Sequence, residues 1–292
     1  MGSDAGLELR LKPEHRLELR LKPEHWGYSP AMVSIAPRPR DYVAVTGPDA
    51  VDYVNRMVSN DVAALAVGGS CEALLLSAKG RIIAPLVVWR RADDDLLLLT
   101  EPDLGESVRA VLTRMRLRAK CEIAAETHSS IVVLGPADGG IACDDYGLPA
   151  VELVDRDPPA GAEPVASEEL ERLRILAGRP RWGSELDDTV LPAEAGLDRY
   201  AISFTKGCYP GQEPIARMHH RGHPNRTLRR LALEAGELPA YDAELVLDEK
   251  VVGRITTAAT DPANGVVALG YVRREVDPDV ELALGTRVVR QL

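Results

Sequence analysis

Residues 206–213 read Lys-Gly-Cys-Tyr-Pro-Gly-Gln-Glu. Two glycines and a proline in so short a stretch interrupt a strand or a helix, so the sequence predicts a tight turn that presents Cys208. A helix is expected to start near Gly211. Its positive dipole end, and the ammonium of Lys206 where it lies near the sulfur, would favour the thiolate form. We therefore expect Cys208 to be a functional thiol, the alternative being a cysteine that only fills space in the core.

The other three cysteines have different surroundings. Cys71 and Cys121 lie in apolar, strand-like stretches and Cys143 lies in an Ala/Asp segment, so we expect them to pack. No Cys-x-x-Cys pair is present, which argues against a structural zinc site and a disulfide framework. The pattern is typical of a reducing compartment, so we expect a cytoplasmic protein without a metal.

Length and composition indicate a soluble protein of more than one domain. A chain of 292 residues is longer than a single hydrophobic core usually grows, and 45% hydrophobic with 27% charged residues is ordinary for a globular protein. We find no apolar run long enough for a membrane span and no secretory signal. The formal charge of -10 disfavours nucleic acid and anionic membranes as partners. We expect a monomer.

One region reverses the overall charge. Residues 206–230 hold six cations and one acid, Glu213. This segment indicates a specific anionic partner; alternatively, its arginines pair with acids elsewhere in the chain.

The N-terminal segment is unusual. The nonapeptide Leu7–His15 is repeated letter for letter at Leu17–His25. Structural repeats drift in sequence and are usually ~20 residues or longer. We interpret residues 1–28 as an artefact of expression or of the assigned start.

From Asp41 onward the pattern indicates an α+β region followed by a small all-β region. Short apolar runs predict strands at 42–46, 71–76, 82–89, 96–100 and 131–134, and helical spacing predicts helices at 49–57, 106–116 and 168–177. We expect Asp49 and Ser167 to cap two of these helices and Gly178 to end the last. Short strands and turns follow from Leu228.

The stretch 206–213, preceded by Leu-Pro-Ala-Glu-Ala-Gly-Leu at 191–197 and followed by Ala216-Arg217, resembles the signature of the YgfZ family. Weaker matches occur, in order, at 59–62, 79–81, 134–136 and 253–256. The resemblance covers Asp41 to Val276. YgfZ proteins are similar to the glycine-cleavage T-protein, an aminomethyltransferase, and are linked to tetrahydrofolate and to iron-sulfur cluster assembly or repair.

The resemblance implies a T-protein-like, three-lobed α+β fold. Two α+β lobes, which we place at 29–225, would surround a central folate channel, and an antiparallel β-barrel would occupy 226–292. It also implies tetrahydrofolate, in a simple or polyglutamylated form, as the ligand, and iron-sulfur clients or assembly proteins as partners. We expect the thiol of Cys208 to face the cavity that receives the pteridine.

A folate pocket needs a carboxylate for the pterin edge, an aromatic wall for the aminobenzoyl ring and cations for the glutamate tail. Trp89 and Trp182 fall where similar sequences carry a folate-side aromatic, although either could be a core residue. Arg226 and Arg217 are candidates for the tail. Glu185 and Glu194 are candidates for the carboxylate.

Two departures from the T-protein pattern bear on activity. The position of the family's catalytic aspartate is matched by Ala84 and Pro85, neither of which can act as a base. The glutamate expected before Ala177-Gly178 is replaced by Leu176, which removes a pterin anchor. Aminomethyl transfer is therefore disfavoured.

Three hypotheses follow. The first is a folate-linked accessory factor for iron-sulfur proteins, in which Tyr209, Gln212, Glu213 and Arg217 surround the thiol. In the simpler alternative, Glu213 and Arg217 form a surface ion pair at i and i+4. The second hypothesis is a folate-dependent one-carbon transferase. The third is a metal-binding or partner-binding protein that uses Cys208 with His219, His220 and His223, although adjacent histidines on a helix point about 100° apart.

Overall fold

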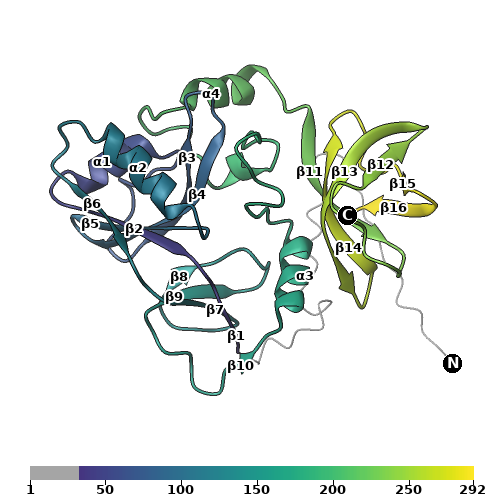
Figure 1. Cartoon of the computed structure of the whole chain (residues 1–292), viewed down its shortest axis with the longest axis horizontal. Coiled ribbons are helices and arrows are strands. Elements are labelled where there is room, and N and C mark those ends of the chain that lie inside the picture. The colour runs from purple at the N-terminus through teal and green to yellow at the C-terminus, as the bar shows by residue number, and fades with distance from the viewer. Residues whose placement is uncertain (1–32) are drawn as a thin grey trace.

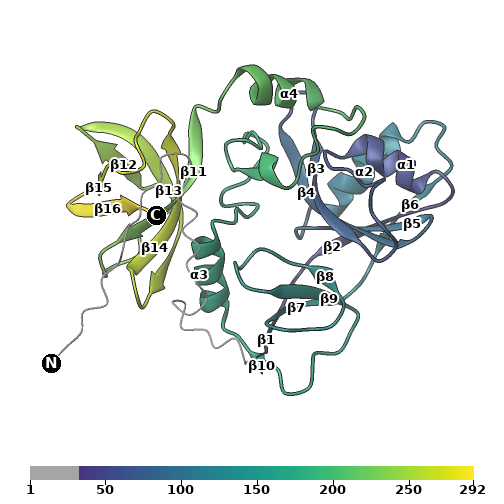
Figure 2. The same ribbon diagram turned by 180° about the vertical axis from the view of Figure 1, so that it is seen from behind.

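The computed structural model describes residues 33–292, so the tandem nonapeptide and the segment 1–28 lie outside the described residues. The described chain forms two five-stranded sheets and a closed barrel. Figure 1 shows the barrel at the end of the molecule opposite the first sheet, and Figure 2 shows the same arrangement from behind. The expected α+β class with a C-terminal antiparallel β-barrel is confirmed.

The first sheet is antiparallel and carries two helices on one face. Its strand order is β3 (Ser70–Leu76), β4 (Ile82–Ala92), β5 (Asp95–Thr100), β2 (Asp41–Thr46) and β6 (Glu122–Glu126). Alternate residues of β5 face opposite sides, so Leu96 and Leu98 pack against α1 (Ala50–Met57) and α2 (Gly105–Met115). Leu97 and Leu99 pack on the other face, with Ile141 of the second sheet. Both faces of the first sheet are therefore buried.

The second sheet has the order β10 (Glu163–Pro164), β1 (Ser34–Pro37), β7 (Ser130–Leu134), β9 (Ala150–Val154) and β8 (Ile141–Ala142). Helix α3 (Ser167–Ala177) lies between this sheet and the barrel in Figures 1 and 2. Its Leu173 shares one core with Val132 of β7 and with Val267 and Leu269 of the barrel. The helix therefore joins the second sheet to the barrel.

The barrel closes in the order β11 (Arg226–Leu233), β14 (Gly265–Arg273), β13 (Lys250–Asp261), β12 (Glu244–Leu247), β15 (Leu282–Leu284) and β16 (Arg287–Gln291). Leu231, Leu245, Val266 and Val289 are among its fully buried core residues. The barrel therefore has a core of its own in addition to the one it shares with α3.

Residues 178–211 connect α3 to α4 (Gln212–Arg221) and contain one short 3-10 helix at Leu197–Arg199. This connecting segment contributes Leu186, Val190 and Leu197 to a core that also includes Leu76 of β3 and Tyr271 of the barrel. It therefore packs against the first sheet and the barrel at once. Among residues 33–292, no helix combines the length and apolar content needed to cross a membrane.

The expected helix caps were partly wrong. Gly178 ends α3 in the left-handed conformation, as predicted. Ser167, however, is the first residue of α3, and Ala166 occupies the cap position. Asp49 occupies the cap position of α1, as predicted, but its side chain makes no capping bond and instead accepts the backbone N–H of Lys120 at 2.7 Å.

His128 links the two sheets through ion pairs. One ring nitrogen lies 2.7 Å from Glu126 at the end of β6, and the other lies 2.5 Å from Asp155, just after β9. Burial alone would lower the pKa of His128, but the hydrogen bonds to Asp155 and Glu126 outweigh burial and raise this pKa.

Replacing His128 by glutamine tests this link. A histidine with a raised folded pKa contributes stability while it is protonated and loses that contribution as the pH rises. We expect the stability difference between wild type and variant to be largest near about pH 6 and to shrink toward about pH 9. Urea unfolding across this range measures it, and a constant difference would contradict the ionic role.

Candidate functional site

The loop that carries Cys208 is fixed by a close contact between two glycine turns. Gly211 has φ +82°, and a Cβ there would lie 2.4 Å from the carbonyl oxygen of Ser77. Gly80, in the turn between β3 and β4, has φ +72°, and a Cβ there would lie 2.8 Å from Pro214. The stretch 79–81 and the stretch 206–213, both part of the sequence resemblance, therefore meet in space.

Lys206 anchors the other end of this loop. Its ammonium donates to the backbone carbonyls of Asn55, Val58 (2.8 Å) and Asn60 (2.7 Å), at the end of α1. Burial lowers the pKa of Lys206 to about 8, and the charges of Asp61 and Cys71 act against this shift. All three N–H groups of the ammonium thus donate to carbonyls at the C-terminal end of α1 or just after it. Lys206 therefore anchors the loop, whereas we had expected its charge to act on Cys208.

Cys208 is exposed, whereas Cys121 and Cys143 are buried and Cys71 is half-buried. Burial raises the pKa of both Cys71 and Cys143 to about 11, so these two are inert thiols. Within the described residues no hydrogen-bond partner is found for the Cys208 sulfur. The turn therefore presents this thiol to solvent, as the sequence predicts.

The neighbours of Cys208 in sequence fall into two groups. Tyr209 is buried in the core with Leu76 and Ile215, and its carbonyl accepts the N–H of Gln212 at 3.2 Å. Glu213 and Arg217 are exposed on α4, and no ion pair joins them in the described part of the chain. Tyr209 thus supports the turn, while Glu213 and Arg217 are available to a partner.

A narrow cavity of about 70 Å³ lies between the two sheets and the connecting segment. Its walls include Trp182, Tyr200 and Pro85, but Cys208 does not line it. The rest of the lining is mainly ionic, because eight charged side chains line the cavity: Arg38, Arg40, Glu72, Glu101, Asp144, Asp145, Glu152 and Arg179. The expectation that the thiol faces the central cavity is therefore wrong.

Most of the charged groups of the central cavity are paired with one another. Arg179 of the connecting segment binds Glu72 of β3 and lies 3.0 Å from Asp145, and it stacks over the ring of Tyr200 at 4.0 Å. Two arginines hold the pKa of Asp145 well below its usual range despite burial, which acts to raise it. Arg179 therefore links the connecting segment to the first sheet and to the loop between β8 and β9 of the second sheet.

Glu152, on β9, holds the other half of this network. Its carboxylate lies 3.1 Å from Arg38 and 3.1 Å from Arg40, and Arg40 also reaches Glu101 at 3.2 Å. Because side chains of both sheets take part, the network bridges the sheets across the cavity.

The structure separates the residues predicted to hold folate. Trp182 lines the central cavity, whereas Trp89 packs with Tyr42, Leu97 and Leu99 between the sheets. Glu185 is 2% exposed and binds Arg174 at 2.9 Å and Thr257 at 2.8 Å, so it braces α3 and the barrel.

Glu194 and Arg226 lie elsewhere, at an open hollow of about 540 Å³ on the barrel edge. Arg226 contacts Glu194 at 3.4 Å and stacks over Tyr271 at 4.5 Å, and Arg273 and Arg274 line the same hollow. This arginine cluster, which sequence reasoning found only through Arg226, suits an anionic group.

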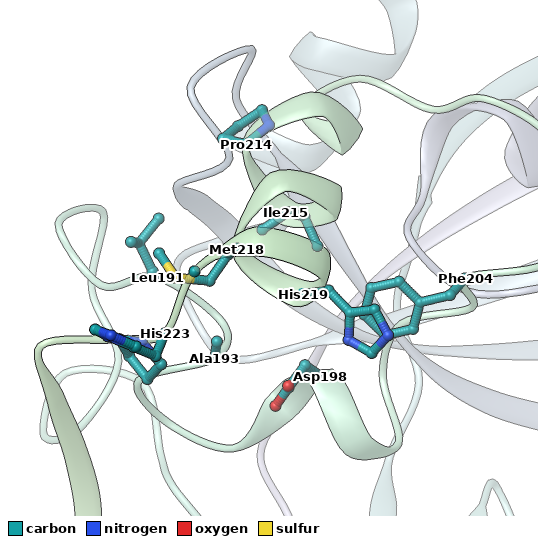
Figure 3. Close-up of a pocket in the computed structure, with 11 residues that line it drawn as sticks. Leu191, Ala193, Asp198, Phe204, Pro214, Ile215, Met218, His219 and His223 are labelled. Carbon is teal, nitrogen blue, oxygen red and sulfur yellow. The ribbon is translucent and has the colours of Figure 1, made fainter. Parts of the chain in front are cut away.

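A third cavity, of about 220 Å³, lies beside α4, and we call it the α4 groove. Figure 3 shows Ile215 and Met218 of α4 on one side and Ala193 and Asp198 on the other. The ring of His219 stacks on Phe204 with centroids 3.8 Å apart. Nothing in the sequence patterns pointed to this groove, because one wall lies in the connecting segment and the other on α4.

The metal-ligand set considered in the third hypothesis, Cys208 with three histidines, is not assembled in the described residues. In residues 33–292 no group of three or more His, Cys, Asp or Glu side chains is placed to hold a metal ion. His219 faces Phe204, and the adjacent His220 meets the His219 ring edge-on, with centroids 5.0 Å apart.

Replacing Gly211 by alanine tests the contact between the two glycine turns. The positive φ and the short approach to Ser77 predict a loss of ~2 kcal/mol or more in the free energy of unfolding. Gly207 of the same loop is the matched control, because a Cβ there meets no atom within 4 Å, and its alanine variant should change stability by less than about 0.5 kcal/mol. Urea unfolding compares the two, and equal effects would contradict the contact.

Comparisons with known proteins agree with this architecture. Residues 40–141 match the model of the GCVT N-terminal domain. The chain is 24% identical to an aminomethyltransferase of Streptomyces avermitilis over 79% of its length and 75% of the relative's. It is 28% identical to a protein of Serratia proteamaculans named tRNA-modifying protein YgfZ, over 86% of its length and 87% of the relative's.

The fold comparison confirms the T-protein-like arrangement. The crystal structure of glycine cleavage system aminomethyltransferase T from Bartonella henselae superposes with a TM-score of 0.78 at 19% identity, covering 90% of this chain and 85% of that one. Residues 40–141 are thus similar to the GCVT N-terminal domain, and the chain as a whole has the fold of a glycine-cleavage aminomethyltransferase.

Proposed function

We propose that this protein is a tetrahydrofolate-binding accessory factor that supports iron-sulfur cluster assembly or repair, with Cys208 as its functional thiol. The observation that carries the proposal is the exposed thiol on a loop fixed at both ends, by Lys206 and by Gly211. Fixing a loop so firmly while leaving its cysteine in solvent favours a role for the sulfur itself.

The surroundings of Cys208 favour action on a partner over self-contained catalysis. A cysteine nucleophile is usually activated by an adjacent base, but the described residues place no hydrogen-bonded histidine or carboxylate on this sulfur. An exposed thiol can instead serve as a soft ligand or exchange partner for an iron-sulfur protein that docks against it. The exposed Glu213 and Arg217 on α4 would contact such a protein.

The central cavity matches folate in chemistry but not in size. Carboxylates, arginines and the aromatic rings of Trp182 and Tyr200 are the groups that a pterin and its glutamate tail require. The volume of about 70 Å³ is, however, far below the several hundred Å³ of ordinary ligand pockets. Four of the lining carboxylates, those of Glu72, Glu101, Asp145 and Glu152, are already paired with arginines and are not free to bind folate.

Aminomethyl transfer receives little support. Ala84 is fully buried in β4, and Pro85, which lines the central cavity, has no acid or base to offer. The carboxylates nearby, Glu72 and Glu101, are held by Arg179 and Arg40. The transferase alternative would regain support from formaldehyde release from an aminomethyl donor in the presence of folate.

Replacing Cys208 by serine tests the role of the thiol. In a host lacking its own equivalent protein, we expect the wild type to restore the activity of iron-sulfur enzymes and the Cys208→Ser variant to lose about ten-fold or more of that effect, as soft-metal and exchange chemistry need the thiolate. Cys71→Ala is the control, because this half-buried thiol is inert. Full restoration by Cys208→Ser would show that the sulfur has no role.

Titration with tetrahydrofolate and its triglutamate form tests the ligand. We expect Arg226→Ala to weaken binding of the triglutamate form more than binding of the monoglutamate form, by about five- to ten-fold, because the variant lacks a cation for the anionic tail. Arg114→Ala, an exposed arginine on α2, should change neither. Calorimetry measures the binding, and the absence of heat and of any thermal shift at about millimolar ligand would rule out folate binding.

A further inference from the structure

The α4 groove has mainly apolar walls and room for one large side chain. Pro214, Ile215 and Met218 lie on one side of α4, and Leu191 of the connecting segment lines the groove with them (Figure 3). His223, which also lines the groove, is exposed, so the groove opens to solvent. A cavity of about 150 Å³ can receive a benzene ring, whereas drug-sized ligands need several hundred Å³. The groove, at about 220 Å³, therefore fits a single aromatic or aliphatic side chain.

The lining favours an aromatic side chain. The thioether of Met218 makes favourable contacts with aromatic rings. The ring of Phe204 also lines the groove, where it stacks on His219 with centroids 3.8 Å apart. A further ring can pack against this pair edge-on or offset.

Two exposed arginines flank the groove. Arg217 follows Pro214 by three residues on α4, and both are therefore neighbours on the helix surface. Arg221 follows Met218 by the same spacing, so each arginine lies beside a groove residue without lining the groove. In the described part of the chain neither arginine has an ion pair. The one acid of the lining, Asp198, directs its carboxylate away from α4 in Figure 3.

The α4 side of the groove is therefore positive, in a chain whose formal charge is -10. Electrostatic complementarity then selects a partner that is acidic at the point of contact. A nucleic acid is disfavoured, because its phosphates require hydrogen-bond donors and these apolar walls supply few.

The spacing of the two arginines matches an extended peptide. Arg217 and Arg221 are one helical turn apart, about 6 Å along the axis. In an extended peptide, side chains two residues apart lie on the same side at about 6.5 Å, and the residue between them points to the opposite side. A segment of the form acid, aromatic, acid can therefore meet both arginines while its ring enters the groove.

We propose that the α4 groove docks an extended acidic segment of a partner protein, with an aromatic side chain in the groove and the flanking carboxylates on Arg217 and Arg221. The inference rests on the proposed function, because it takes this partner to be the iron-sulfur protein that meets Cys208. Pro214 follows Cys208 by six residues, so their Cα atoms lie at most about 22 Å apart. A protein docked in the groove can therefore reach the thiol.

Synthetic peptides test the docking site in the full-length protein. The probe is a nonapeptide of serine and glycine with Glu-Trp-Glu at its centre and a fluorescent label at one end. Two comparison peptides carry Gln-Trp-Gln or Glu-Ala-Glu in its place. We expect the Glu-Trp-Glu peptide to bind at least about ten-fold more tightly than either of them, as measured by fluorescence anisotropy.

Variants of the protein localise the binding. Ala193→Leu should fill the groove and weaken the Glu-Trp-Glu peptide at least about ten-fold. Arg217→Glu combined with Arg221→Glu should reverse the preference, so that a Lys-Trp-Lys peptide binds more tightly than the Glu-Trp-Glu peptide. Arg114→Glu, at an exposed arginine on α2, is the control and should change neither affinity. Thermal melting checks folding, and binding gained by the charge-reversed variant cannot come from an unfolded protein.

Several outcomes would overturn the inference. Equal affinity for the Glu-Trp-Glu and Gln-Trp-Gln peptides, an unchanged affinity in a folded Ala193→Leu protein, or the same preference after charge reversal would each do so. Displacement of the Glu-Trp-Glu peptide by decauridine at lower concentration than by the unlabelled peptide would make α4 a nucleic-acid surface instead.

The Cys208→Ser experiment remains a separate readout. If the peptides bind as expected while Cys208→Ser fully restores the iron-sulfur enzymes, the proposed function fails and the docking site stands. If Cys208→Ser loses that effect while the Glu-Trp-Glu peptide does not bind, the docking inference alone is refuted.

Discussion

The contact between the turn at Gly80 and the turn at Gly211 determines where the loop that carries Cys208 lies. Two backbone segments approach so closely that neither position has room for a side chain, and both take a conformation that glycine adopts without strain. This contact fixes the start of α4 on the hairpin of β3 and β4. Lys206 is bound to the end of α1, so the short loop between Lys206 and Gly211 has little conformational freedom. Cys208 lies between these two anchors and is exposed.

The buried ion pairs play a different part from the apolar cores. Apolar packing of Leu97, Leu99 and Ile141 is enough to hold the two sheets face to face. The ion-pair network around Arg179 and Glu152 adds geometric specificity, because each arginine–carboxylate pair is favourable only at a defined distance and orientation. Buried pairs of this kind often add little net stability, because both charges lose their hydration. Their effect here is to set how the sheets and the connecting segment meet, at the cost of closing the central cavity.

Much of the fold and part of the site could be predicted from the sequence. The apolar runs of β4 and β5 predicted two strands of the first sheet, and the glycine at 178 predicted the end of α3, because these signals are local. The turn at 206–213 was predictable for the same reason. The hydrogen-bond partners of the Lys206 side chain could not be predicted, because these carbonyls lie about 150 residues earlier in the chain and no local pattern connects them to Lys206. The α4 groove escaped notice since its apolar residues show no regular spacing across the connecting segment.

The position of α3 has a consequence for how the protein comes apart. Leu173 and Ile175 share a core with Ala259, Val267 and Leu269 on the outer side of the barrel, and Arg172 reaches Asp261 at 2.6 Å. Cutting the chain before Arg226 would expose this apolar surface of the barrel to solvent, and it would also expose the apolar side of α3 that packs against it. The C-terminal barrel is thus not an independent domain. Because α3 packs against both the second sheet and the barrel, we expect the two to unfold together in a single cooperative transition.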